Sequence, residues 1–373
     1  MPVQDSNQPP DSGGVVLLAG AGSSCHLGLP TLDDLLNRAV IGNDDVAARI
    51  RQTRQTIEAQ PTRFRPAVFE ELIVRIKHYL AAAHMLRTDY TFRREIGQLP
   101  YDVDSGCVER KWKEALTRCY RILLGEYGPN RIDAASKEFL ITNKLFGTLA
   151  ECNGGDFNVY TTNYDCSFQV LAANSTNLAF MTHIDSDNGR FTERWHPGNP
   201  AVTPETRKIY VHRLHGCIGW FNISLAPDPG SIIKEVYGAG ADLDIQDDDF
   251  LDLMCIKLLQ SQLVGTNPAF ASAFDEFCSD LRSVKTLLVW GFSFRDLEVV
   301  RAINHSFSER QTPLSILYLD PYLSENNARE NIERTLTQAP IQPAKGFRPR
   351  KIAWTPSDGL SKLVPAIAGS IGC

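Results

Sequence analysis

The chain has 373 residues, of which 43% are hydrophobic and 22% are charged. These values are ordinary for a globular protein with a full core, so a disordered, collagen-like or very small disulfide-stabilised protein is excluded. Lys and Arg total 38 while Asp and Glu total 44, which gives a net charge of −6. This balance gives no overall electrostatic reason to bind nucleic acid or an anionic membrane, although it is compatible with a local basic groove.

Residues 1–14 are polar and rich in Pro, Ser, Asn, Gln and Gly, which predicts a flexible N-terminal arm. They contain no Lys or Arg, so they do not have the pattern of a secretory signal sequence. The apolar run that follows is far shorter than the roughly 20 residues that cross a bilayer. Nine scattered cysteines without any C-x-x-C pair disfavour a disulfide framework or a zinc ribbon. We therefore expect a cytoplasmic protein.

Residues 15–19 form a short apolar run that ends in glycines, which predicts a buried parallel strand, and residues 31–40 follow with a helical pattern. From about residue 42 to residue 154 the apolar residues recur with the helical period, as in 68–83, 112–123 and 139–149. This predicts a large helical insert, which is more typical of a scaffold or a self-association surface than of a second active site.

Strand patterns return after the insert, at 157–161, 209–214, 286–290, 315–319 and 351–354, and helical patterns at 250–263 and 297–307 lie between some of them. Strands that alternate with helices predict an α/β fold, namely a Rossmann-like parallel sheet with helices on both faces and no zinc module. The expected division is an N-terminal arm (1–14), a Rossmann domain (15–335) with the helical insert (about 42–154), and a C-terminal extension (336–373).

Each main strand pattern ends at residues suited to contact with a ligand. These segments are 20–24 (GAGSS), 161–165 (TTNYD), 214–216 (LHG), 291–296 (GFSFRD) and 320–321 (DP). Because ligands of open parallel sheets bind beyond the carboxyl ends of the strands, the segments predict a shared crevice. In the fourth segment, Ser293 and Asp296 have the spacing of a helix cap, although Ser293 could also bind a phosphate or a ribose.

The first segment is a glycine-rich turn that we expect to lead into a helix, whose N-terminus would favour a diphosphate. A tight strand-to-helix turn is the structural alternative. The segment lacks the lysine of a Walker loop, and Cys25 stands where a dehydrogenase fingerprint has its third glycine. Asp44 and Asp45 have the spacing of the acid that such a fingerprint needs, but they lie in a polar stretch and not at a strand end.

Asn163 and Asp165 follow a predicted strand directly, so their side chains would project into the crevice, where Asn163 could hold a ribose hydroxyl or a water molecule. An Asx turn before the next helix is the structural alternative for both residues. His212 and His215 are three residues apart on one strand, so alternation places them on opposite faces and argues against a two-histidine metal site. His215, at the strand end, is the candidate for a general base near pH 7.

The order of these segments carries a family resemblance. GAGSS with GLP (20–24 and 28–30), TNYD (162–165), LHG (214–216) and GFS (291–293) resemble, in this order, the motifs of sirtuins. They are most similar to the sirtuin-like domains of bacterial anti-phage NAD hydrolases, and FEEL (69–72) resembles a helix of that branch. The resemblance covers residues 15 to about 325, so it implies that 15–335 is a sirtuin-like Rossmann domain.

The resemblance implies a site for NAD⁺ as substrate, with no metal. The residues that would hold the diphosphate are Gly20, Ala21, Gly22, Ser23 and Ser24. Asn163 and Asp165 would hold the nicotinamide ribose and carboxamide, with Asn163 and His215 as the catalytic residues and His215 as the base. The remaining contacts, to the phosphates and the adenosine, would come from Gly291, Ser293 and Asp320.

Two departures from the deacylating sirtuins narrow the expected activity. The chain lacks their zinc-binding C-x-x-C pairs, and Thr31, Leu32 and Asp33 replace their Asp-Phe-Arg sequence. We therefore expect an NAD⁺ glycohydrolase that releases nicotinamide and ADP-ribose and depletes NAD⁺ in anti-phage defence. The alternatives are an NAD-dependent protein deacylase or ADP-ribosyltransferase, and a non-catalytic subunit that senses NAD⁺ or ADP-ribose. The resemblance also implies a homo-oligomer and a separately encoded ATPase or sensor subunit, while regulation by nucleotides or DNA stays open.

Overall fold

The computed structural model describes most of the chain. The described residues are 14–59, 68–88, 105–181, 206–218, 220–223, 232–235, 251–253, 268–310, 312–320, 323–337, 341, 343–344, 347, 349–352 and 362–371. The flexible arm predicted for residues 1–14 lies outside the described residues except for Gly14.

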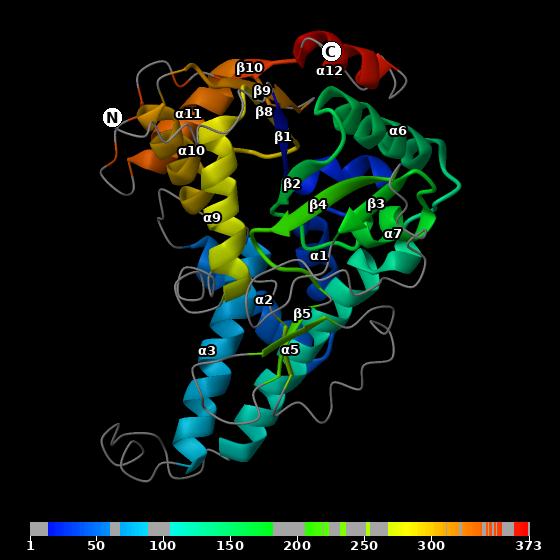
Figure 1. The fold of residues 1–373 in the computed structure, drawn as a ribbon. Coiled ribbons are helices and arrows are strands. Elements are labelled where there is room, and N and C mark those ends of the chain that lie inside the picture. Colours follow the sequence, from blue (N-terminus) through cyan, green and yellow to red (C-terminus); the bar gives the residue numbers. More distant parts are fainter. Residues whose placement is uncertain are drawn as a thin grey trace, which may run out of the picture.

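A seven-stranded parallel sheet forms the centre of the molecule (Figure 1). Its strands are β1 (Val15–Ala19), β2 (Phe157–Thr161), β3 (Leu178–Met181), β4 (Arg207–Arg213), β8 (Thr286–Trp290), β9 (Ser315–Leu319) and β10 (Arg350–Lys351). Their order in space is β10-β9-β8-β1-β2-β4-β3, and all neighbouring pairs are parallel. The order reverses at β1, because β2 lies on one side of it and β8 on the other. This is the topological switch point of a doubly wound sheet, so the predicted Rossmann-like fold is confirmed.

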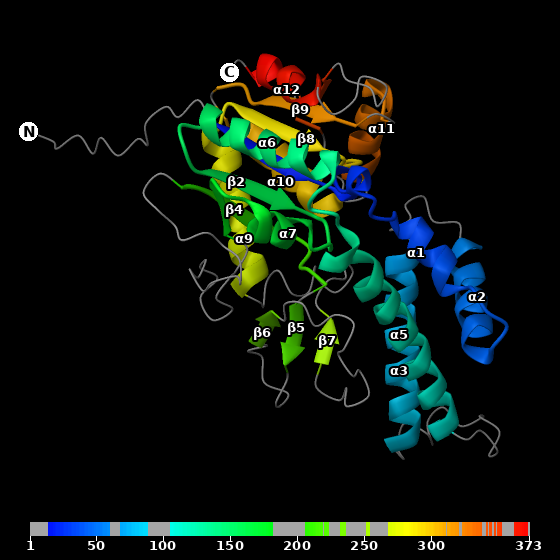
Figure 2. The same ribbon diagram turned by 90° about the vertical axis from the view of Figure 1, so that its right-hand side faces the viewer.

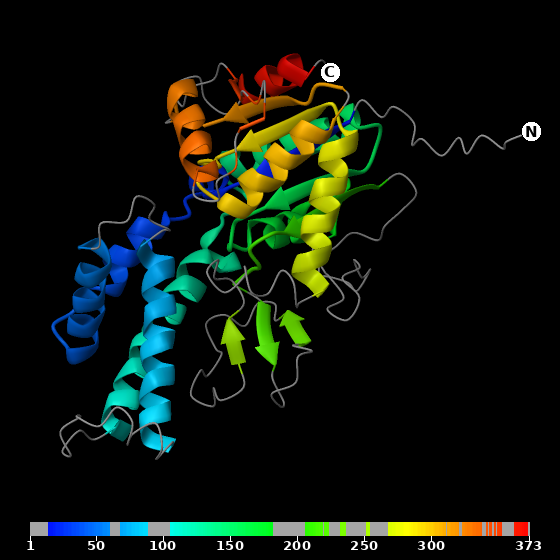
Figure 3. The same ribbon diagram turned by 90° about the vertical axis from the view of Figure 1, so that its left-hand side faces the viewer.

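Helices cover both faces of the sheet because its strands are apolar on both sides. In β1, Leu17 packs into one hydrophobic core while Val16 and Leu18 pack into the other. The first core includes residues of α6 (Lys137–Cys152), α7 (Ser167–Asn174) and α12 (Leu363–Ile371). The second includes residues of α9 (Pro268–Ser283), α10 (Leu297–Glu309) and α11 (Glu325–Leu336). Figure 2 shows α6 and α7 in front of the sheet, and Figure 3 shows α9, α10 and α11 on the other side.

The segment between β1 and β2 is helical, as the apolar period predicts. Its helices before α6 are α1 (Leu32–Ala39), α2 (Asp45–Glu58), α3 (Val68–Thr88) and α5 (Ser105–Tyr127). Side chains fix where two of them begin, since Thr31 is the N-cap of α1 in a capping box with Asp34 and Asp44 is the N-cap of α2. Helices α3 and α5 lie side by side and extend away from the sheet (Figure 2).

A small antiparallel sheet was not predicted from the sequence. It contains β5 (Trp220–Ile223), β6 (Ile232–Glu235) and β7 (Leu251–Leu253), in the order β6-β5-β7. The helix predicted for 250–263 is therefore wrong at 251–253, and its remaining residues lie outside the described part of the chain. A short apolar run does not distinguish a strand from a helix by its period alone. Among the described helices, none combines the length and the hydrophobicity that crossing a bilayer requires.

Of the cysteines in the described part of the chain, six are free thiols, three of them buried, and one departs from the expectation of a chain without disulfides. Cys152, the last residue of α6, is disulfide-bonded. Spacing along the sequence could not predict this, because a disulfide depends on which thiols meet in space. Within α5, burial raises the pKa of the Cys119 thiol to about 12, so this group stays protonated and acts as a small apolar side chain.

Candidate functional site

A cavity of about 550 Å³ lies at the carboxyl ends of the parallel strands, within the range of roughly 300–1,000 Å³ that is common for small-molecule sites. The segments that follow β1, β2, β4, β8 and β9 line it, together with the first turns of α1 and α3. The cavity thus lies at the topological switch point, where a doubly wound sheet binds its ligands. The five strand ends meet in one place, as the sequence predicts.

Most of the predicted site residues lie in the cavity wall, namely Ala21, Gly22, Ser24, Asn163, Asp165, His215, Gly291, Ser293 and Asp320. Gly20 and Ser23 do not line it, and both support it from behind. Gly20 packs against the turn after β8, and Ser23 Oγ accepts a hydrogen bond from Asn163 Nδ2.

The glycine turn after β1 interlocks with the turn after β8. Gly22 N donates to the carbonyl of Gly291 at 3.0 Å, and Gly20 N donates to that of Trp290 at 2.8 Å. A Cβ on Gly20 would lie 2.6 Å from the Gly291 oxygen. A Cβ on Gly291, whose φ is +63°, would lie 2.2 Å from Ser23 N. These positions therefore need glycine because two backbones touch there, whether or not a ligand is bound.

The glycine turn leads into the predicted helix at 31–40 only through an intervening segment. Ala21–Ser23 and Cys25–Leu27 form two short 3₁₀ turns, and α1 begins only at Leu32. The amides of Gly22 and Ser23 already donate to protein carbonyls. The turn consequently lacks the long helix dipole on which the predicted diphosphate contact depended.

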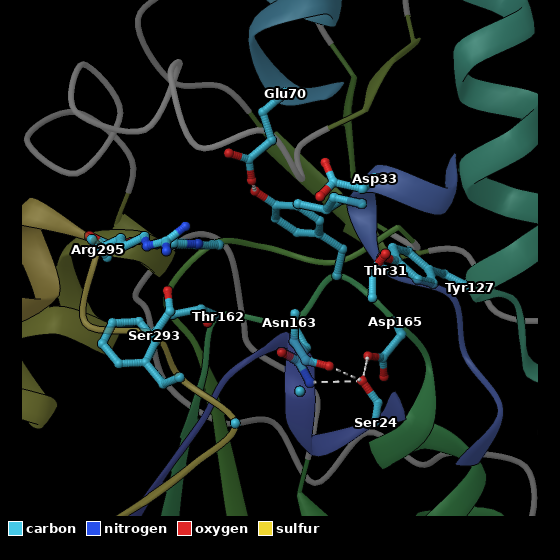
Figure 4. Close-up of a pocket in the computed structure, with 18 of the residues that line it drawn as sticks. Ser24, Thr31, Asp33, Glu70, Tyr127, Thr162, Asn163, Asp165, Ser293 and Arg295 are labelled. Atoms are coloured by element: carbon cyan, nitrogen blue, oxygen red, sulfur yellow. Dashed lines mark hydrogen bonds and ion pairs between the residues drawn. The ribbon is translucent and has the colours of Figure 1, made fainter. Parts of the chain in front are cut away.

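The loop that carries Asn163 and Asp165 is fixed by hydrogen bonds to the glycine turn (Figure 4). Asn163 Nδ2 donates to Ser23 Oγ at 3.0 Å and to Ser24 Oγ at 3.2 Å. The carboxylate of Asp165 accepts from Ser24 Oγ at 2.8 Å and from the backbone amide of Ser167 at 2.9 Å. Asp165 therefore forms the Asx turn before α7 and lines the cavity at the same time.

The other end of the Asn163 side chain is the best-defined ligand contact in the cavity. Asn163 is 3% exposed, and its Oδ1 is buried without a hydrogen-bond partner among the described residues. A buried acceptor that stays unsatisfied costs about 1–3 kcal/mol. A hydroxyl or a water bound in the cavity would remove this cost, so the site fits a ligand that donates a hydrogen bond here.

Arg213 holds the same loop from inside the sheet. It is fully buried at the end of β4, and its Nη1 donates to the carbonyl oxygens of Asn163 at 3.3 Å and Asp165 at 3.2 Å. Its Nη2 donates to Gln169 Oε1 in α7 at 2.6 Å. One guanidinium thus connects β4, the loop after β2 and α7.

His215 lies in the cavity wall just after β4, with its Nε2 2.6 Å from Asp296 Oδ2. Both residues are buried, at 6% and 4% exposure. Asp296 is also the N-cap of α10, because its Oδ1 accepts from the amide of Val299 at 3.2 Å. The predicted capping role is thus performed by Asp296, and the contact with His215 is additional.

His212 faces away from the cavity, as strand alternation predicts. Its ring stacks on Tyr160 with centroids 4.6 Å apart, and its Nε2 lies 3.1 Å from Asn158 Oδ1. Burial lowers the pKa of His212 to about 3, so the ring is neutral. Within the described part of the chain, no group of three or more His, Cys, Asp or Glu side chains is arranged to hold a metal ion.

Several cavity residues were not predicted as site residues, namely Asp33, Glu70, Tyr127, Tyr164, Arg295 and Asp296. Glu70 enters from α3 and accepts a short hydrogen bond from the hydroxyl of Tyr164. Figure 4 shows Arg295 and Glu70 approaching the cavity from different sides. The FEEL sequence at 69–72 was a signal for Glu70, whereas nothing local in the sequence indicated Arg295.

The comparison with known families agrees with this geometry. Residues 158–343 match the model of a family described as SIR2-like domain. The match runs from β2 to beyond α11, so it contains Asn163, His215 and Asp296. It supports a sirtuin-like domain in this chain and an activity related to NAD⁺. No curated protein matches the chain.

Proposed function

We propose that this protein is an NAD⁺ glycohydrolase, which hydrolyses the bond between nicotinamide and ribose and releases nicotinamide and ADP-ribose. The observation that carries the proposal is that Asn163 and His215 line one cavity at the switch point of a sirtuin-like sheet. A dinucleotide suits this place, because its two halves can lie on the two sides of the switch point.

The charged side chains of the cavity support one orientation of bound NAD⁺. The described carboxylates of the cavity are those of Asp33, Glu70, Asp165, Asp296 and Asp320. Arg295 is the only Lys or Arg among the described lining residues. We propose that the cationic nicotinamide ring lies among the carboxylates near Asn163, and that the anionic diphosphate lies toward Arg295 and the glycine turn.

The proposed reaction needs one group that orients the ribose or the attacking water and one base that takes a proton from the water. The C1′–N bond breaks, and nicotinamide leaves as a neutral molecule with the bonding electron pair. A water molecule adds to the cationic C1′ of the ribose and loses a proton to His215. Asn163 Oδ1 accepts a hydrogen bond from a ribose hydroxyl or from this water and thereby orients it. Nothing in this sequence of steps requires an acyl group or a protein substrate.

Nicotinamide release from NAD⁺ by the purified protein tests the proposal. We expect His215→Ala to lower the rate by about 10²–10⁴-fold, which is typical for loss of a general base. The Asn163→Ala, His215→Ala double variant should fall to the background rate. His305→Ala is the matched control, because His305 is an exposed histidine of α10 outside the cavity. Full activity of the double variant would refute the assignment.

The products separate this proposal from its alternatives. Transfer of an acyl group or of ADP-ribose to a peptide, with no product when water is the only acceptor, would indicate a deacylase or a transferase. Tight binding of NAD⁺ without turnover would indicate a sensing subunit. We propose anti-phage defence as the biological setting, with a separately encoded ATPase or sensor subunit as partner, and this part rests on the motif resemblance alone.

A further inference from the structure

The contact between His215 and Asp296 connects strand ends on opposite sides of β1. His215 Nε2 and Asp296 Oδ2 lie 2.6 Å apart, so the imidazole and the carboxylate are in direct contact at ion-pair distance. The two side chains are only 7% and 4% exposed. Because water does not screen a buried contact of this kind, it is stronger than its counterpart at a surface.

The carboxylate of Asp296 is fixed before any ligand binds. Its second oxygen caps α10 through the amide of Val299. The preceding turn is also held, because the carbonyl of Phe294 accepts from Thr335 Oγ1 at 2.9 Å and that of Ser293 accepts from Asn331 Nδ2 at 2.8 Å. Asp296 therefore presents one oxygen to α10 and the other to His215 from a rigid frame.

We infer that Asp296 is a positioning residue for His215. An ionised carboxylate can only accept hydrogen bonds, so the proton of the neutral imidazole lies on Nε2 and the lone pair lies on Nδ1. Asp296 thus selects the nitrogen that acts as the base. When Nδ1 takes a proton from the attacking water, the oxygen electron pair goes to C1′ and the carboxylate stabilises the imidazolium that forms.

Other charged groups share the cavity with His215, namely Asp33, Glu70, Asp165, Arg295 and Asp320. Arg213, two residues before His215, directs its guanidinium to the carbonyls of the Asn163 loop. Among the described residues, Asp296 is the one whose charged group lies within ion-pair distance of the imidazole. The catalytic part of this inference rests on the proposed function, whereas the tautomer rests on the geometry alone.

Two substitutions separate positioning from capping. Asp296→Asn and Asp296→Ser both keep a side chain that caps helices well, but neither supplies a carboxylate to His215. We expect both variants to lower kcat for NAD⁺ hydrolysis by at least about tenfold, with KM and the melting temperature close to those of the wild type. Asp44→Asn is the matched control, because Asp44 is the N-cap of α2 and does not line the cavity.

The tautomer is measured separately, by ¹⁵N NMR of histidine-labelled protein, with His215→Asn used to assign the signal. At a pH at which the ring is neutral, we expect the proton on Nε2 in the wild type and a changed signal in Asp296→Asn. A proton on Nδ1, or an unchanged signal, would overturn the inference even if the wild type hydrolysed no NAD⁺. Wild-type kcat in both cap-preserving variants would also overturn it and leave the proposed hydrolase intact.

Discussion

Gly291 is the residue at which the turn after β8 meets the glycine turn after β1. A methyl group there would meet Ser23 N at 2.2 Å and the carbonyl carbon of Gly22 at 2.4 Å. Both atoms belong to the backbone, so neither can turn aside as a side chain could. We expect Gly291→Ala to displace the glycine turn, to destabilise the protein by about 2–4 kcal/mol and to abolish NAD⁺ hydrolysis.

Gly154→Ala separates this steric effect from backbone strain. Gly154 has a similar φ of +75°, but a Cβ there would meet nothing within 4 Å. Its cost should be only the strain of a left-handed conformation, about 1–2 kcal/mol, with activity retained. Urea unfolding and nicotinamide release measure the two effects. If Gly291→Ala and Gly154→Ala lost equal stability and equal activity, the close approach of the turns after β1 and β8 would be shown to have no effect of its own.

At the residue scale, the sequence predicts which side chains reach the cavity better than it predicts their contacts. Asn163 and His215 were accessible to prediction because each stands directly after a recognisable strand. The contact of His215 with Asp296 was not, because a predicted crevice shared by several strand ends does not show which side chains meet across it. The capping pattern correctly indicated Asp296 as a helix cap, but it gave no sign of the contact between Asp296 and His215.

At the scale of elements, Glu70 connects the helical insert to the loop after β2. Its carboxylate accepts a hydrogen bond from the hydroxyl of Tyr164, the residue between Asn163 and Asp165 in the chain. Glu70 and Tyr164 are both buried. A hydrogen bond to a charged group contributes about 1.5–3 kcal/mol. We expect Glu70→Gln to lower kcat/KM about tenfold, since an amide accepts this bond more weakly and the loop loses order.

Tyr164→Phe should have a similar effect, and the double variant should be little worse than either single variant, because both remove the same contact. Glu71→Gln is the matched control, since the neighbouring Glu71 pairs with Arg75 one turn along α3 and does not line the cavity. Steady-state kinetics with NAD⁺ measures all four proteins. Additive effects of Glu70→Gln and Tyr164→Phe would contradict the proposed connection.

The elements themselves were predictable where their patterns were long or fully apolar. The predictions for β1, β2, β8 and β9 agree with the structure to the residue, because buried parallel strands are continuous apolar runs bounded by polar residues. β3 was missed because LAFM, at 178–181, is too short to distinguish from the neighbouring helical pattern. The two 3₁₀ turns were missed because their geometry follows from contact with the turn after β8, which no local pattern contains.

At the scale of the whole molecule, exposed apolar side chains indicate where copies of the chain would associate. The large hydrophobic residues exposed in the described part of the chain are Ile41, Tyr79, Met85 and Leu140. All of them lie in the helical segment between β1 and β2. The homo-oligomer stays a prediction, and we expect its interface to include this segment.

Light scattering across a range of protein concentrations tests this expectation. Met85→Glu, which places a charge on an exposed position of α3, should shift the protein toward monomer. Glu333→Lys on the exposed side of α11 is the control, and it should leave the oligomer unchanged. A wild-type protein that stays monomeric at every concentration and is fully active would contradict the expectation.

The C-terminal residues show what composition alone could not predict. In the segment predicted as a C-terminal extension (336–373), β10 pairs with β9 and α12 packs against α6. The central sheet and its first core are therefore completed by the end of the chain. The strand pattern at 351–354 overlaps β10, whereas α12 was not predicted, because one short helix that packs by a single face carries too little pattern to be assigned without its partner.

The buried guanidinium of Arg213 has a consequence for protein engineering. Because it donates hydrogen bonds to the carbonyl oxygens of Asn163 and Asp165, a change in the conformation of residues 163–165 would disturb the end of β4 beneath them. Attempts to make the cavity accept dinucleotide analogues should instead diversify the rim, at Asp33, Ser293 and Arg295, whose side chains are exposed. Variant libraries restricted to these positions would alter which dinucleotide the cavity binds while leaving the loop and the strands that position Asn163 and His215 unchanged.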